Sequence, residues 1–144
     1  MKKSVFLSIA FFTLLMISCN TTTNTVITEK IPTISYVKTF GGSGNDIMKK
    51  NEILSDGSTL LLSSSSSIDG DCVGNHGSSD ICIIKLDNSN NILWRKMIGG
   101  SLDELSYDFA TTSDGGCVVL GTTNSINGDI SINKGKKDIV VVKL

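Results

Sequence analysis

Acidic and amide side chains gather between Asp69 and Asp80, in a segment with the residue types of a calcium-binding loop. Asp69 and Asp71 could supply oxygen ligands, Gly74 stands at the sixth position and Asp80 at the twelfth, as in known calcium loops. Val73 occupies a position where a ligand is expected, and Asp80 replaces a bidentate glutamate. We prefer the simpler, structural interpretation that these side chains hydrogen-bond to their own backbone in turns.

Residues for catalysis are sparse. His76 is the only histidine, and no motif marks a serine nucleophile. Glycoside hydrolysis needs two carboxyl groups about 5–10 Å apart, and Asp56, Asp71 and Asp80 are the acids to consider. Each of them recurs at the matching position of a second copy of the pattern, as Asp114, Asp129 and Asp138. A residue kept in every repeat more often holds the fold than performs one reaction, so we predict that the protein is not an enzyme.

Three cysteines follow the N-terminal region. Cys82 and Cys117 lie in apolar runs and are predicted to pack as small hydrophobic side chains. A disulfide is compatible with an oxidising compartment, but three thiols leave one unpaired. The sequence therefore leaves the pairing of Cys72, Cys82 and Cys117 open.

The N-terminal residues have the pattern of an export signal. Lys2 and Lys3 precede an apolar run that is shorter than the roughly 20 residues of a membrane span. The run ends in Met16-Ile17-Ser18-Cys19, which resembles the lipobox of bacterial lipoproteins. This resemblance implies a signal peptide over 1–18 and a lipid on Cys19. Residues 19–32 are polar and threonine-rich, and they are predicted to form a flexible tether.

The rest of the chain, residues 33–144, is an internal duplication. Residues 33–86 align without a gap with residues 91–144, and 19 of the 54 aligned positions are identical. Many of the shared residues are glycine or aspartate, which indicates shared turns. We therefore divide the domain into repeats at 33–90 and 91–144, so that position 33 corresponds to position 91 and position 86 to position 144.

Each repeat is predicted to form four antiparallel strands. The first set of four strands is expected at 47–54, 59–64, 80–86 and 91–98, so its last strand lies at the start of the second repeat. Asp56-Gly57 and Asp114-Gly115 stand between apolar runs, which is a strong signal for a tight hairpin and predicts a positive φ at both glycines. The unbroken apolar runs at 81–84 and 139–142 predict burial on both faces of a sheet. The fold class is therefore all-β, with two four-stranded propeller-blade-like units.

The strand count suggests how the domain closes. Thr33–Phe40 aligns with 91–98, and its aromatic Tyr36 matches Trp94, so it is predicted to be a fourth-type strand. The total is then eight strands. We expect Thr33–Phe40 to pair beside Asp138–Leu144, either within the chain or in a neighbouring copy, because an unpaired edge invites association.

The repeat also resembles a known group. The glycine pairs at 41–42 and 99–100, the Ser-Asp-Gly turns, the Asp-Gly-Asp loop and the strand with Trp94 are similar to the repeats of propeller-like lipoproteins from Bacteroidetes-type bacteria. No activity is firmly attached to that group, whose members usually carry many repeats. Propellers typically have four to eight blades. The two repeats here are therefore part of a larger propeller, associate with other chains, or pack as a sandwich.

These observations give a preferred function and two alternatives. We predict an envelope lipoprotein, anchored by lipid in the outer membrane, with a non-enzymatic binding or scaffolding domain. The first alternative is a carbohydrate-binding module, with calcium as an optional cofactor and Trp94 and Tyr36 as an aromatic platform. The second is part of a polysaccharide hydrolase. Expected partners are the membrane, a glycan or protein, and a second copy of the chain. Nucleic acid is excluded because lysine and arginine form no cluster and the formal net charge is −1.

Overall fold

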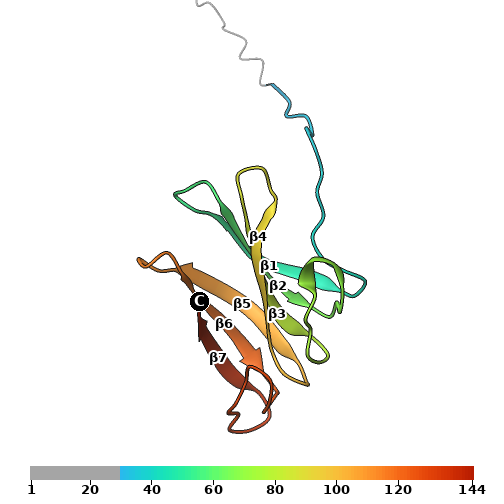
Figure 1. The fold of residues 1–144 in the computed structure, drawn as a ribbon, viewed down its shortest axis with the longest axis vertical. Helices are drawn as coiled ribbons and strands as arrows, with labels where there is room; N and C mark the ends of the chain where they lie inside the picture. Colours follow the sequence, from blue (N-terminus) through green and yellow to red (C-terminus); the bar gives the residue numbers. More distant parts are fainter. Residues whose placement is uncertain (1–29) are drawn as a thin grey trace, which may run out of the picture. The chain divides into compact units, whose positions relative to one another are not determined.

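The computed structural model describes residues 30–144, of which Tyr36–Leu144 form one compact unit. The predicted signal peptide and Cys19 lie outside the described residues, as does most of the predicted tether. Residues 30–35 are exposed and have no regular secondary structure. The unit from Tyr36 to Leu144 contains every described strand (Figure 1). No helix among residues 30–144 has the length and apolar character needed to cross a membrane.

The all-β prediction is confirmed. Seven strands form two antiparallel sheets, and the described residues contain no α-helix. The first sheet has four strands in sequential order: β1 (Asp46–Ile53), β2 (Thr59–Ser65), β3 (Asp80–Leu86) and β4 (Ile92–Ile98). The second sheet has three: β5 (Glu104–Thr111), β6 (Cys117–Thr123) and β7 (Asp138–Lys143). A short 3-10 turn, η1 (Gly70–Cys72), lies between β2 and β3.

The two sheets repeat the same geometry. Corresponding strands begin at residues 46 and 104, 59 and 117, and 80 and 138. The first strand of each sheet carries a bulge at the same place, between Met48 and Lys50 in β1 and between Ser106 and Asp108 in β5. Equivalent positions in the two sheets can therefore be compared directly through the repeat alignment.

The Asp-Gly hairpins form as predicted. Gly57 and Gly115 have φ values of 82° and 83°. The carboxylate of Asp56 accepts the backbone N–H of Ser58 at 2.9 Å, and that of Asp114 accepts the N–H of Gly116 at 3.1 Å. The left-handed conformation favours glycine because it has no Cβ. The same local chemistry therefore closes the first hairpin of each sheet.

The prediction that an eighth strand forms within the chain is wrong. Residues 33–40 form no strand, and within the described chain β7 pairs only with β6. Instead, the ammonium group of Lys38 donates to the carbonyl of Asn90 in the β3–β4 turn at 2.5 Å, and Phe40 packs against the first sheet. A strand needs a neighbour to complete its ladder, and β4 has β3 beside it whereas 33–40 has no such strand. No closed sheet forms among the described residues.

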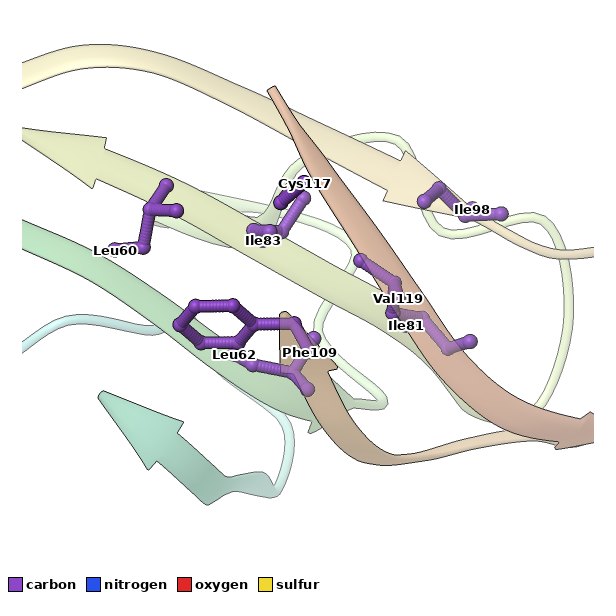
Figure 2. Packing of buried hydrophobic residues seen from close by; sticks show 8 residues of the cluster. All are labelled: Leu60, Leu62, Ile81, Ile83, Ile98, Phe109, Cys117 and Val119. Atoms are coloured by element: carbon purple, nitrogen blue, oxygen red, sulfur yellow. The ribbon is translucent and has the colours of Figure 1, made fainter. Parts of the chain in front are cut away.

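The main core lies between the two sheets. Leu60, Leu62, Ile81, Ile83 and Ile98 from the first sheet pack with three buried side chains of the second, Phe109, Cys117 and Val119. Figure 2 shows the side chains of both sheets directed into this common space. A second cluster, which includes Ile84, Leu86 and Met97, covers the opposite face of the first sheet. Strand β3 is thus buried on both faces.

The second sheet is not covered in the same way. Val140 and Val142 point toward the core, whereas Ile139 and Val141 are 80% and 61% exposed. The prediction that the run at 139–142 is buried on both faces is therefore wrong. The physical reason is that no described element packs on that side of the second sheet.

The cysteines divide into a disulfide and a buried thiol. Cys72 of η1 is bonded to Cys82 of β3, with 6.1 Å between their Cα atoms. Cys82 packs in the apolar cluster on the far face of the first sheet, as predicted, and the pairing that the sequence left open is the bond to Cys72 of η1. Cys117 is a buried free cysteine in the main core, as predicted, and burial raises the pKa of its thiol.

Candidate functional site

The three acids of the predicted calcium loop each bind the backbone of their own chain. Asp69 accepts the N–H of Ser43 at 2.7 Å, and Asp71 accepts the N–H of Gly41 at 3.3 Å. Asp80 accepts the N–H of His76 at 2.8 Å. The bonds of Asp69 and Asp71 fix the segment 41–43 before β1 against the loop after β2. Because the carboxylates are engaged in separate turns, they act as structural ties.

The second repeat makes the same ties. Asn127 accepts the N–H of Ser101 at 2.9 Å, Asp129 accepts that of Gly99 at 3.3 Å, and Asp138 accepts that of Lys134. The substitution of Asp69 by asparagine at position 127 keeps the acceptor oxygen. What the repeat retains is therefore a hydrogen-bond acceptor at each turn.

The structure does not gather these side chains into a metal centre. In the part of the chain that the structure describes, no three His, Cys, Asp or Glu side chains lie together as potential ligands. Asp69 and Asp71 point toward the Gly41–Ser43 segment, while Asp80 is fully buried beside His76. The oxygen donors of the sequence pattern are thus distributed over different turns.

His76 and Asp80 form the pair nearest to a catalytic arrangement. The Nδ1 atom of His76 lies 2.8 Å from the carboxylate of Asp80. Among residues 30–144, no serine or cysteine side chain hydrogen-bonds to the ring of His76, so a triad is not assembled. Burial raises the pKa of Asp80, and the hydrogen bonds from His76 oppose that rise. The Oδ1 atom of Asp80 is buried without a hydrogen-bond partner.

Glu104 is a second fully buried acid that sequence reasoning missed. Its carboxylate accepts the N–H of Gly100 at 2.7 Å and the hydroxyl of Thr123 at 2.5 Å. In the first repeat Asp46 does the same with Gly42 and Ser65. The repeat alignment places an acid at both positions. Because one is aspartate and the other glutamate, the pair does not appear among the identical residues. Since Glu104 and Asp80 do not reach solvent, a polysaccharide could not contact either carboxyl group.

The remaining acid considered for hydrolysis lies elsewhere. Asp56 is in the β1–β2 turn, 3.5 Å from the ammonium group of Lys85, near the end of β3 opposite to Asp80. The hydrogen bond from Ser58 lowers the pKa of Asp56. The five residue steps along the strand from Asp80 to Lys85 correspond to roughly 17 Å, which exceeds the spacing of a glycosidase pair. The structure therefore does not bring Asp56 and Asp80 together.

An apolar groove lies between the two sheets at the end where the Asp-Gly hairpins turn. It has a volume of about 400 Å³, and its lining includes Trp94, Lys85, Lys96 and Leu144. Trp94 is 39% exposed there, whereas the equivalent Tyr36 is 61% exposed. The two predicted aromatic residues therefore lie in separate grooves and do not form one platform.

Comparison with protein-family models, with curated proteins and with solved structures finds no match for this chain. The functional assignment consequently depends on the sequence pattern at the N-terminus and on the geometry of the two sheets.

Proposed function

We propose that the chain is a lipid-anchored lipoprotein of the bacterial envelope, most simply of the outer membrane, with a non-enzymatic domain for binding or scaffolding. In this proposal the two sheets are propeller-blade-like units that stack face to face. The likeness of the sequence to the repeat lipoproteins of Bacteroidetes-type bacteria supports the proposal. So does the sequence Met16-Ile17-Ser18-Cys19, which has the form of a lipobox.

One structural observation carries the non-enzymatic part of the proposal. The polar side chains that recur in both repeats are engaged with backbone N–H groups, as Asp71 and Asp129 are with Gly41 and Gly99. Meanwhile the second sheet presents Ile139 and Val141 to solvent. Exposed apolar side chains on one sheet face are typical of an interaction surface. The chain therefore has the features of a module that binds through a face of a sheet.

Metabolic labelling tests the anchor. Labelled palmitate should enter the full chain, and Cys19→Ser should abolish the label and release the protein from the membrane fraction. Ser18→Ala is the matched control, because it keeps a small residue before the cleavage point and should retain the label. Persistent labelling of the Cys19→Ser variant would contradict lipidation at this residue.

Carbohydrate binding is a second candidate because Trp94 lines the groove between the sheets. Aromatic rings can stack on sugar rings, and Trp94 is partly exposed in this groove. Screening the full chain against a glycan array tests this, with Trp94→Ala expected to lose any signal. The neighbouring exposed Leu93 provides a control, since Leu93→Ala should leave the signal unchanged. Release of sugar from an intact polysaccharide would instead favour the hydrolase.

A further inference from the structure

The contact between the two sheets uses different faces of the repeated unit. The first sheet contributes the face that carries Leu62 and Ile83, whereas the second contributes the face that carries Val119 and Val142. The repeat alignment relates Leu62 to Leu120 and Ile83 to Val141. The packing is therefore head to tail, and it leaves one unused copy of each face on the molecule.

The unused face of the second sheet has the residue types of the buried one. Its members are Val118, Leu120, Ile139 and Val141, which correspond to Leu60, Leu62, Ile81 and Ile83. Leu120, Ile139 and Val141 are 41%, 80% and 61% exposed, while their counterparts are 0% exposed. This apolar face is built for a neighbour that the described chain does not supply.

The unused face of the first sheet already carries part of such a neighbour. The groove between the two sheets is lined by Trp94 and Lys96 of β4 together with Cys117 of β6 and Leu144, which follows β7. The four equivalent residues, Tyr36, Lys38, Thr59 and Leu86, line a groove of about 520 Å³ on the first sheet. Residues 36–40 therefore lie on the first sheet as β4 lies on the second. A β3-type strand beside them is the missing element.

Two residues that contact the second repeat, Gly77 and Ser64, have counterparts in the second repeat that make no such contact. A Cβ on Gly77 would lie 2.4 Å from the carbonyl oxygen of Gly100, so the contact between repeats requires glycine there. The equivalent Gly135 has nothing within 4 Å and no positive φ, so nothing in the described chain requires glycine at that position. Likewise, Ser64 Oγ accepts the N–H of Ser106 at 2.9 Å, whereas the hydroxyl of the equivalent Thr122 is buried without a partner.

We propose that a second copy of this chain docks head to tail, with its first sheet on the free face of this chain's second sheet. The interface repeats the one within the chain, and residues 36–40 of the incoming copy become the strand beside β7. The β3–β4 register transfers directly: Ile81↔Ile98, Ile83↔Lys96 and Lys85↔Trp94 give Ile139↔Phe40, Val141↔Lys38 and Lys143↔Tyr36.

This arrangement deepens the scaffolding function proposed above and rests on it, because it names the partner. The same contact gives three local gains. It covers Val141, it places the incoming Gly42–Ser43 segment against Gly135, and it offers the N–H of Met48 to the hydroxyl of Thr122. Heterologous contacts of this kind close into rings or grow into filaments, depending on the rotation between copies.

The oligomeric state of the full chain in detergent micelles tests the proposal by sedimentation velocity over a range of concentrations. The wild type should associate. Ile139→Asp should weaken association by about a hundredfold or more, because an unpaired carboxylate would be buried opposite Phe40 of the incoming copy. Gly135→Val should also weaken it through steric clash. Ile126→Asp is the control, since Ile126 and its counterpart Ile68 are both 72% exposed although the first sheet already has its neighbour.

Unchanged circular dichroism and thermal unfolding of the dilute variants would show that the fold is intact. The proposal would be overturned by a wild type that stays monomeric at all concentrations, or by Ile139→Asp and Gly135→Val variants that associate as the wild type does. A monomeric wild type that still carries palmitate on Cys19 would remove the stacking and leave the lipoprotein assignment standing.

Cross-linking tests the register and identifies the occupant. A Lys38→Cys chain mixed with a Val141→Cys chain should form a mixed disulfide, because their repeat counterparts Lys96 and Ile83 are directly opposed in the first sheet. A mixture of Lys38→Cys and Ile126→Cys chains is the control. Since each chain carries one of the new thiols, the bond must join two copies. Equal yields in both mixtures would refute the register.

Discussion

Strands β3 and β7 have nearly the same sequence but different surroundings. Both begin with aspartate and isoleucine, continue through small apolar residues and reach a lysine at the same place. Yet Ile81 and Ile83 in β3 are fully buried, whereas Ile139 and Val141 in β7 are mostly exposed. The difference arises from what packs on each sheet. An apolar run thus shows that a strand can be buried on both faces. Whether it is buried depends on the elements that pack against it.

The comparison is tested most strongly by placing a charge on each strand. Ile83→Asp should prevent folding or cost more than about 4 kcal/mol, because an unpaired carboxylate would enter the core. Val141→Asp should change the free energy of unfolding of the dilute protein by only about 0.5 kcal/mol. Denaturant unfolding of both variants measures the two effects. Similar costs for the two substitutions would mean that β7 is covered as β3 is.

The disulfide provides a second difference between the repeats, because the counterparts of Cys72 and Cys82 are Ile130 and Val140. The Cys72→Ala/Cys82→Ala double variant should lose about 2–3 kcal/mol, the value expected for closing a loop of this length. Amide hydrogen exchange should locate the loss in the first sheet. A reducing agent should destabilise the wild type and leave the double variant unaffected. A wild type that is indifferent to reduction would argue against the bond.

The hairpins test whether equivalent turns obey the same rule. Gly115 has open space around its Cα, so Gly115→Val should cost about 1–2 kcal/mol through the positive φ alone. Gly115→Asn should recover most of that loss, since asparagine tolerates the left-handed region. Gly57→Val should cost more, because its Cβ would also approach the side chain of Asn88. Thermal unfolding ranks the three variants, and equal stabilities would contradict the turn assignment.

The smallest expected effect concerns pH. Burial raises the pKa of Asp80, so the folded state binds this proton more tightly than the unfolded state does. Its contribution is therefore present in full below the unfolded pKa of about 4 and is lost as pH rises through the raised value. Asp80→Asn should flatten the pH dependence of the unfolding free energy between pH 7 and 4, as measured by denaturant unfolding at each pH. Equal slopes in the wild type and the variant would exclude this role of Asp80.

Local features of the fold could be predicted from the sequence because their causes are local. The Asp-Gly pairs impose the hairpins at Gly57 and Gly115. The alternation between apolar and turn residues located the four strands of the first sheet to within one residue at each end. The strand expected at 33–40 failed because a strand also needs a partner. The pattern shared with β4 describes a surface that can pair, and the described chain places no β3-type strand beside it.

The site illustrates a different limit. The loop from Asp69 to Asp80 has metal-ligand residue types, but composition does not reveal that Asp69 and Asp71 bind Ser43 and Gly41 across the sequence. The pairing of Cys72 with Cys82 likewise depends on the short turn η1, for which no pattern was recognised. Glu104 could have been found by aligning the repeats on charge as well as on identity.

The sequential strand order has a consequence for how the chain acquires its structure. In both sheets each strand pairs with the next one along the chain, so every ladder is closed either by a tight turn or by a loop such as 66–79 or 124–137. Pairings of this kind need little loop-closure entropy, which places the domain among the faster-folding all-β topologies. A nascent chain that emerges N-terminus first can therefore pair its strands one after another. The second sheet can then form by packing against the completed first sheet.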